Sequence, residues 1–237
     1  MEMNSRSLMQ TARLAGLLYL IWIITGLFVM FYIPSQIDLK GDAATAAQSL
    51  LSNELLFRTG VVTDLIGGVL WVLMVLVFYR LFVSVDERQA KLLVALVLVQ
   101  IPVVIIVEAF NIAALMILKG EVLKTFELAQ KQDLALLLLR MNDYGTLAVE
   151  MFWGLWLLPL ASLVYRSRFL PRFLGVWLMI NGLALLVLSF TSLLLPEFKD
   201  LVFKLVFPAM LGEVAIMLWL LFVGAKLNSP NHAPNPS

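Results

Sequence analysis

The sequence predicts an all-α integral membrane bundle of six transmembrane helices with short outer interfacial helices. Hydrophobic residues make up 62% of the 237 residues, and charged residues make up only 14%. Soluble domains average about 45–50% apolar and about 25% charged residues. The charges also lie between long apolar runs rather than along them. Such a chain has too little polar surface to coat a water-soluble globule, so we expect it to lie in a lipid bilayer.

Six apolar runs are long enough to cross a membrane. A crossing needs about 20 residues, because an α-helix rises about 1.5 Å per residue and the hydrocarbon layer is about 30 Å thick. The six runs lie at about 14–33, 57–82, 92–118, 144–165, 173–195 and 205–225. The fourth run can begin earlier than 144, near Leu134, because an apolar segment leads into it.

These runs predict one membrane domain over residues 1–227. The tail at 228–237 is polar and rich in proline, and we expect it to be disordered because it has too few apolar residues to pack. Three prolines inside the predicted spans are expected to kink their helices: Pro102, Pro159 and Pro208.

The distribution of Lys and Arg predicts the orientation of the bundle. Cytoplasmic loops of membrane proteins retain an excess of positive charge. The side that holds both termini carries nine basic and three acidic residues, whereas the opposite side carries six basic and eight acidic residues. Both termini are therefore expected in the cytoplasm. The strongest cytoplasmic anchor is the connection between the fourth and fifth spans, which carries Arg166, Arg168 and Arg172.

Two connections on the outer side are predicted to form short helices. Residues 41–56 begin with the N-cap candidates Asp42 and Thr45, and Thr45 has capping-box spacing with Gln48. Residues 119–133 place apolar side chains three and four residues apart, opposite charged positions. Both segments suit amphipathic connectors on the outer interface, and both also suit a lid over a cavity.

Five carboxyl groups and two guanidinium groups lie within or beside the predicted spans. A charged group at the middle of a span costs about 2.5–3.5 kcal/mol on insertion scales. We therefore expect these groups to face the bundle interior, to pair with one another, or to be protonated. Together with two amide side chains, the candidates for a polar or ligand-binding site are Arg58, Asp64, Glu108, Asn111, Arg140, Asp143, Glu150, Asn181 and Glu213.

Four of these acids are expected at a similar depth. At about 1.5 Å per residue, Asp64, Glu108, Asp143 and Glu213 lie within about 15 Å of the outer surface. An outward-opening polar cavity would produce this pattern, and so would a satisfied buried network.

Residue spacing also predicts local pairs. Arg140 with Asp143, and Glu108 with Asn111, are three residues apart and can interact on a helix. We further expect Arg58 and Arg140 to be internal counter-charges of the buried acids.

The chain lacks the residues that most enzymes and metal centres need. It contains no cysteine, and its one histidine, His232, lies in the tail. Thiolate and histidine metal sites and histidine-dependent hydrolysis are therefore excluded from the spans, and no cofactor is expected. Carboxylate acid–base chemistry stays open, but an enzyme is the least favoured class. A net charge of +1 gives no basic surface for nucleic acid.

Four segments carry a resemblance to a known family: LFRTGVVTDLIGG (56–68), RMNDYG (140–145), FWGLWLLPLASLVYRSRFLPRFLG (152–175) and GEVAIMLWLL (212–221). With the ARLAGLLYL opening, they resemble the bacterial multi-pass proteins grouped as domain of unknown function 4386. The resemblance runs from Ala12 to about Lys226. It implies about six spans in a bacterial cytoplasmic membrane, and it implies no reaction, substrate or cofactor.

Two classes of function follow from these patterns. Ionisable residues at membrane depth commonly mark substrate or ion pathways, which favours binding or transport of a small polar or cationic solute. Alternatively, the charges fix helix packing in a scaffold, sensor or assembly protein that binds a protein partner. The lipid bilayer is an expected partner in both cases.

Overall fold

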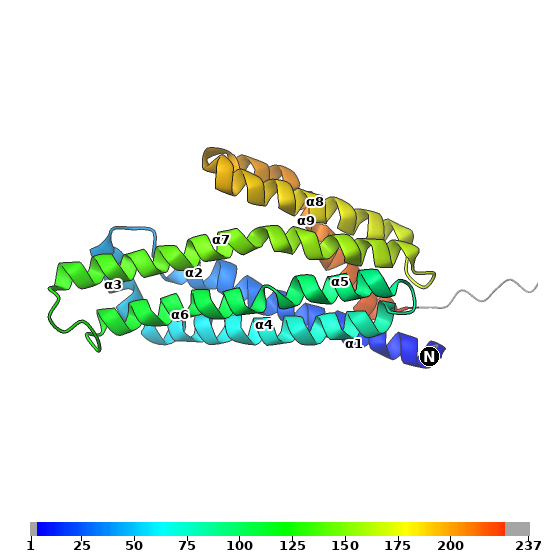
Figure 1. Ribbon diagram of the computed structural model, residues 1–237, viewed down its shortest axis with the longest axis horizontal. Helices are drawn as coiled ribbons and strands as arrows, with labels where there is room; N and C mark the ends of the chain where they lie inside the picture. The colour runs from blue at the N-terminus through cyan, green and yellow to red at the C-terminus, as the bar shows by residue number, and fades with distance from the viewer. Residues whose placement is uncertain (1–3, 226–237) are drawn as a thin grey trace, which may run out of the picture.

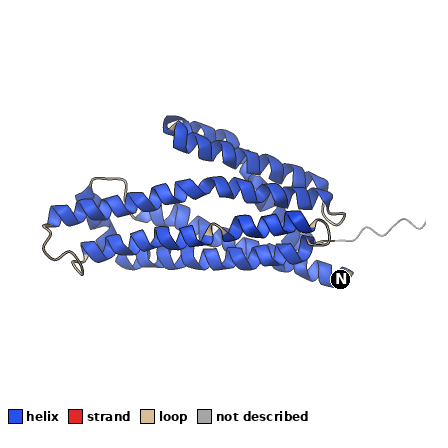
Figure 2. Cartoon of the chain, viewed as in Figure 1, coloured by secondary structure: helices blue, strands red, loops and turns tan. Residues whose placement is uncertain are grey.

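The computed structural model of the protein describes residues 4–225, which fold into helices and connecting turns without a strand (Figure 2). In chain order these elements are α1 (Ser5–Leu27), the π-helical turn η1 (Phe28–Tyr32), α2 (Ile33–Gln36), α3 (Ala43–Ser52), α4 (Glu54–Phe82), α5 (Glu87–Leu98), α6 (Ile101–Leu118), α7 (Leu128–Arg166), α8 (Arg172–Leu194), the 3-10 turn η2 (Pro196–Phe198), α9 (Lys199–Leu218) and the π-helical turn η3 (Trp219–Val223).

Six helical stretches in the described chain are long and apolar enough to cross a membrane. Each overlaps one of the predicted runs, so the six-span all-α bundle is confirmed. The stretches are Ser5–Gln36, Glu54–Phe82, Glu87–Leu118, Leu128–Arg166, Arg172–Leu194 and Pro196–Val223. The tail predicted to be disordered lies outside the described residues.

Helix α7 is the centre of the arrangement, since it packs against α3, α5, α6 and α8 (Figure 1). It has 39 residues, which gives a length of about 58 Å, nearly twice the thickness of the hydrocarbon layer. Helix α8 packs along one half of α7, α9 packs against α8, and the pair tilts away from the rest of the bundle (Figure 1). The other half of α7 therefore extends into a separate end of the molecule, beside α3 and the end of α6.

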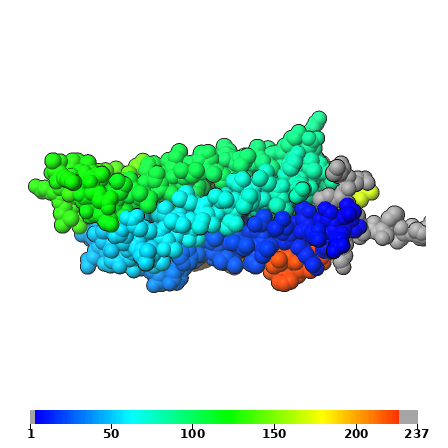
Figure 3. Space-filling view, turned by 90° about the horizontal axis from the view of Figure 1, so that it is seen from below, coloured from blue at the N-terminus to red at the C-terminus, as the bar shows by residue number. Residues whose placement is uncertain are grey.

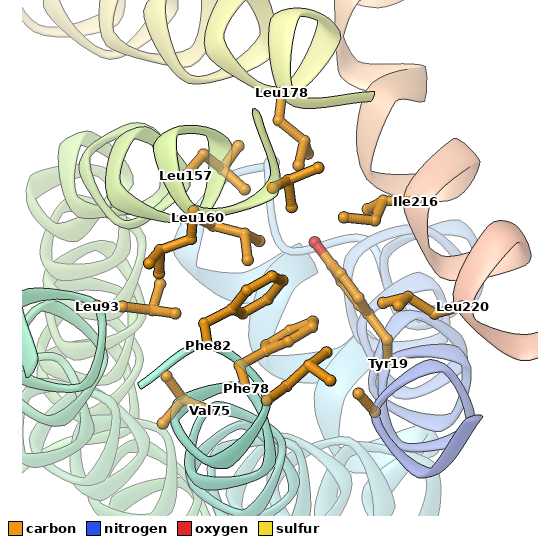
Figure 4. Packing of buried hydrophobic residues seen from close by; sticks show 14 of the residues in the cluster. Tyr19, Val75, Phe78, Phe82, Leu93, Leu157, Leu160, Leu178, Ile216 and Leu220 are labelled. Atoms are coloured by element: carbon orange, nitrogen blue, oxygen red, sulfur yellow. The ribbon is translucent and has the colours of Figure 1, made fainter. Parts of the chain in front are cut away.

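Two hydrophobic cores divide the bundle along its length. The larger core joins α1, α4, α5, α7, α8 and α9 and contains large buried side chains such as Tyr19, Phe78 and Leu160 (Figure 4). The smaller core includes Leu50 of α3 and Leu139 of α7. The end predicted to be outside is thus a packed structure rather than a set of loose connections.

Helix α1 closes the bundle against the end of α9. The two lie side by side on one face of the molecule, where Figure 3 shows α1 in dark blue and the last turns of the chain in orange. Gly16 allows this approach, because a Cβ at this position would lie 2.5 Å from the backbone nitrogen of Leu221.

The helix predicted within 41–56 is present as α3. Asp42 is its N-cap, and the Thr45 backbone N–H donates a 2.8 Å hydrogen bond to Asp42 Oδ1. This bond holds the pKa of the Asp42 carboxyl below its usual value, so the cap is complete at neutral pH and weakens as the pH falls through that lowered pKa. The buried face of α3, with Ala46 and Leu50, packs against the bundle and chiefly against α7.

The prediction of a separate helix within residues 119–133 is wrong. Gly120 (φ 69°) and Leu123 (φ 52°) adopt left-handed conformations, which end α6 and form a turn. Helix α7 then begins at Leu128, and its capping box joins Glu127 and Gln130. The last part of the predicted segment is therefore the first turn of α7, which also confirms that the fourth span begins before 144.

Pro102 coincides with a break in the third span, because α5 ends at Leu98 and α6 begins at Ile101. Proline has no N–H to continue the hydrogen-bond ladder of α5. Pro159 and Pro208, in contrast, lie inside the continuous helices α7 and α9.

The closest approach of α7 to α8 generates a stability prediction. A Cβ on Gly154 would lie 2.6 Å from the Gly182 carbonyl oxygen and 3.0 Å from the Leu186 nitrogen. Gly154→Ala should therefore destabilise the protein by about 1–3 kcal/mol, because backbone atoms must move apart. Thermal unfolding in one detergent measures the effect.

Gly26→Ala is the matched control, since nothing lies within 4 Å of the added Cβ. Alanine is the better helix former by up to about 1 kcal/mol, so this variant should be neutral or slightly stabilised. Equal unfolding temperatures for the two variants would contradict the assigned α7–α8 contact.

Candidate functional site

The acids of the spanning helices are not gathered at one place. The structure brings Asp64 and Glu108 together, and it places Glu213 in a different cluster with Tyr19 and Asn181. We call the first group, Asp64, Glu108, Asn111 and Asn142, the Asp64–Glu108 cluster. We call the second group, Tyr19, Asn181 and Glu213, the Tyr19–Glu213 cluster.

The Asp64–Glu108 cluster joins α4, α6 and α7. Glu108 is buried, with 6% of its surface exposed, and its carboxyl lies within hydrogen-bonding range of the Asp64 carboxyl. Asn111 Nδ2 donates a 3.0 Å hydrogen bond to Glu108 Oε2, which confirms the predicted pair. Asn142 reaches over from α7, interacts with Glu108, and donates a 2.9 Å bond to the Val107 carbonyl oxygen.

Small residues permit these helices to approach. Gly68 is buried on α4, one turn beyond Asp64, and a Cβ there would lie 3.8 Å from Ile101 Cδ1 of α6. Gly145 of α7 faces α6 so closely that a Cβ there would meet the Val107 side chain. Glu108 is therefore buried in a packed junction, and Asp64 is half-buried beside it.

No basic side chain in residues 4–225 forms an ion pair with Asp64 or Glu108. Arg58 was expected to be their counter-charge, but its Nε lies 2.8 Å from Glu54 Oε1 instead. Lys119 Nζ lies 2.9 Å from the same oxygen. Arg58 is thus held at the end of α4, and the expectation of an internal counter-charge is wrong.

The absence of a basic partner limits the charge state of the pair. Two carboxylates in contact repel each other strongly in a medium of low dielectric constant. A proton or a cation between them removes that repulsion. The cluster thus has the chemistry of a cation or proton acceptor.

The Tyr19–Glu213 cluster ties α1 to α8 and α9. Tyr19 Oη donates a 2.7 Å hydrogen bond to Glu213 Oε2. Asn181 Nδ2 lies 3.3 Å from Glu213 Oε1 and 3.4 Å from the Met210 carbonyl oxygen, and it donates to both. Figure 4 shows the Tyr19 hydroxyl pointing between Leu178 and Ile216. Neutral donors therefore bind both Glu213 oxygens.

Aromatic packing fixes the position of the Tyr19 hydroxyl. Its ring centroid lies 5.8 Å from that of Trp22, 5.9 Å from Phe78 and 6.1 Å from Trp156. Sequence analysis did not select Tyr19, because it stands in an otherwise apolar run. A tyrosine in the interior of a span was the available signal, since tyrosine is usually enriched at membrane interfaces.

Arg140 and Asp143 form the predicted pair, but they lie at the surface. Their closest atoms are 3.5 Å apart, and 39% and 65% of the two side chains is exposed. Arg140 also donates a 3.2 Å bond to the Lys40 carbonyl oxygen. Arg140 therefore ties α7 to the chain before α3, and its predicted role as an internal counter-charge is wrong.

Glu150 lies apart from both clusters. It is half-buried, its buried Oε2 accepts no hydrogen bond within the described chain, and Lys199 interacts with it electrostatically. A further buried amide that sequence analysis missed is Gln100, which donates a 2.6 Å bond to the Leu96 carbonyl oxygen at the break before α6. Its position two residues before Pro102 was the available signal.

The three anchor arginines have different environments. Arg166 Nη1 lies 2.7 Å from Asp86 Oδ2 and links the α7–α8 turn to the start of α5. The Arg172 guanidinium lies 5.6 Å from the centroid of the Tyr165 ring. Arg168 is exposed and lines a cavity.

Within residues 4–225, no group of three or more His, Asp or Glu side chains is placed to hold a metal ion. A cation bound there would therefore contact at most two acids. At the Asp64–Glu108 cluster the available oxygens are two carboxyl groups and two amide carbonyls. Oxygen donors of this kind suit hard cations and ammonium groups.

The Tyr19–Glu213 hydrogen bond yields a second prediction. Tyr19→Phe removes the donor, and Glu213→Gln weakens the acceptor without changing its size, because it replaces one carboxyl oxygen by an NH₂ group and removes the charge. A double-mutant cycle should give a coupling energy of about 0.5–1.5 kcal/mol between the two positions. Tyr144→Phe, at a side chain with 69% exposure, should show no coupling to Glu213→Gln. A coupling energy near zero for Tyr19 in unfolding experiments would contradict the assigned bond.

Comparison with known proteins places most of the described chain in one family. The family model described as Domain of unknown function (DUF4386) matches residues 14–224. No curated protein and no solved structure matches the chain. The matched residues include both clusters and part of each of the six candidate spans. The resemblance of the four segments is thus confirmed, and the chain belongs to the DUF4386 family of multi-pass membrane proteins.

Proposed function

We propose that the protein binds a small cationic or polar solute in the membrane and carries it across, with the Asp64–Glu108 cluster as the binding site. One observation supports this proposal above the others. The buried Glu108 of α6 meets the half-buried Asp64 of α4, and no Lys or Arg within residues 4–225 forms an ion pair with either one. A ligand with a positive charge would supply the missing partner.

The amides of the cluster support a ligand-binding role. Asn111 and Asn142 use their NH₂ groups as donors to Glu108 and to the Val107 carbonyl. Their side-chain carbonyl oxygens are acceptors and can join the two carboxyl groups around a cation or an ammonium group. A purely structural contact would not need two acids, because well-packed apolar side chains stabilise a core at least as well as buried charges.

The proposed setting is a bacterial inner membrane with both termini in the cytoplasm and residues 1–227 as a single membrane domain. The excess of basic residues on the side of the termini supports this orientation. In it, the Asp64–Glu108 cluster would lie in the outer half of the membrane, ten residues from the ends of α4 and α6 at Glu54 and Leu118.

A second candidate is a scaffold, sensor or assembly protein. The Tyr19–Glu213 cluster favours it, because neutral donors satisfy that acid and join α1 to α8 and α9. In this case Asp64 and Glu108 would share a proton and act as a structural contact.

Ligand-dependent stability discriminates between the two candidates. Purified protein should be screened by thermal shift against inorganic cations, amines and small polar metabolites at pH 5.5 and 7.5. A ligand at 100 times its Kd stabilises the native state by about 2.7 kcal/mol. We expect at least one cationic compound to raise the Tm and expect Asp64→Asn and Glu108→Gln to abolish that rise.

Glu197→Gln is the matched control, since it removes an exposed acid near the start of α9. It should leave the ligand effect unchanged. Uptake of the same compound into proteoliposomes then separates binding from transport. If Asp64→Asn and Glu108→Gln keep the full ligand response, the proposed site is wrong; if no compound stabilises the folded wild-type protein, the scaffold role is supported instead.

A further inference from the structure

A cavity of about 240 Å³ lies beside the α7–α8 turn and shares no lining residue with either acidic cluster. Its walls are the turn from Arg168 to Pro171 and the side chains of Trp219 and Val223 at the end of the last helix, with Gly224 beyond them. Figure 1 places this junction at the end of the bundle where α1 begins. One wall therefore carries a guanidinium group, and the other is apolar.

Arg168 is the basic group available to a ligand in this cavity. The neighbouring Arg166 is paired with Asp86 at 2.7 Å, and Arg172 lies against the ring of Tyr165. Arg168 is exposed and forms no ion pair with any residue from 4 to 225. The first turn of α8 also contains no acidic residue, so the positive potential of that helix end adds to the charge of Arg168.

The apolar wall continues into the lipid-facing surface. Phe173 is 54% exposed and Phe222 is 70% exposed, as expected for side chains in contact with lipid. Phe173 also packs edge-on against Trp219, with 6.1 Å between ring centroids. The cavity thus lies where the apolar surface meets the arginine-bearing turn, which is the level of phospholipid headgroups.

We propose that this cavity binds the headgroup of an anionic phospholipid. The phosphate would contact Arg168, and the glycerol and first acyl carbons would lie against Trp219 and Val223. The volume suits a headgroup rather than a whole lipid, so the acyl chains would extend along the exposed aromatic surface. Basic pockets between transmembrane helices bind acidic headgroups in this way. This site is independent of the function proposed for the Asp64–Glu108 cluster.

The test compares lipids that differ only in headgroup charge. Full-length protein in a neutral detergent is titrated with dioctanoyl phosphatidylglycerol or dioctanoyl phosphatidylcholine, and binding is followed by thermal shift and native mass spectrometry. Phosphatidylglycerol should bind more tightly. Arg168→Gln should weaken its binding about fivefold, which corresponds to about 1 kcal/mol for one basic residue.

Arg88→Gln is the matched control, because it removes an exposed arginine of α5 that lines no part of the cavity. Equal weakening by Arg88→Gln and Arg168→Gln would overturn the proposal in favour of diffuse attraction. Val223→Phe keeps every charge and fills the apolar side of the cavity, so it should also weaken phosphatidylglycerol binding. Unchanged binding in this variant would overturn the proposal even if Arg168→Gln fails to fold.

Inorganic phosphate provides the last arm of the experiment. If millimolar phosphate stabilises the protein and displaces phosphatidylglycerol, the site takes a free anion and the assignment to a lipid is wrong. If phosphate has no such effect and the lipid binds, the apolar wall contributes to recognition as proposed.

Discussion

The hydrocarbon layer offers no hydrogen-bond partner, and this constraint governs the whole structure. Backbone groups inside the layer must be satisfied within the chain, which leaves helices as the spanning elements here. Polar side chains face the same requirement and turn inward. Glu108 of α6 is buried against α4 and α7, and Asn181 of α8 is fully buried where α8 meets α9. Helices inside the layer must also pack closely, because no water can fill a gap between them. Helices α7 and α8 do so through Gly154 and Gly182.

Charged pairs and neutral pairs differ in their exposure. Ion pairs at helix ends join Glu54 to Arg58 and Lys119, and Arg166 to Asp86, and the pair of Arg140 with Asp143 lies on the exposed surface of α7. Deeper in the bundle, acids interact with hydroxyl and amide donors instead. A buried ion pair loses the hydration of two ions, and that loss can exceed their attraction. Neutral donors stabilise a buried carboxyl at a smaller desolvation cost. A tyrosine of α1 therefore suits Glu213 better as a hydrogen-bond donor than a lysine or arginine would.

The sequence was sufficient for features that depend on local spacing. Run lengths predicted the six spans, Asp42 was a recognisable N-cap, and three-residue separations gave the pairs of Glu108 with Asn111 and Arg140 with Asp143. Rotation about the helix axis could also have corrected one expectation. Arg58 and Asp64 are six residues apart and project about 120° from each other, whereas Arg58 and Glu54 are four residues apart on one face. In contrast, the Tyr19–Glu213 bond joins residues 194 positions apart, and only the packing of α1 against α9 brings them together.

The two acidic clusters impose different demands on the protein. In the Tyr19–Glu213 cluster, one acid has a neutral donor on each of its two oxygens and lies beside a packed aromatic core. The buried acceptor without a partner among the described residues is there an amide oxygen, Asn181 Oδ1. In the Asp64–Glu108 cluster, two acids share a single amide donor to Glu108 Oε2 and a neighbouring amide from α7. The number of acidic oxygens there exceeds the number of donors around them. Because two neighbouring carboxylates repel each other where the dielectric constant is low, the Asp64–Glu108 cluster gains more from an added proton or cation than the single acid of the Tyr19–Glu213 cluster does.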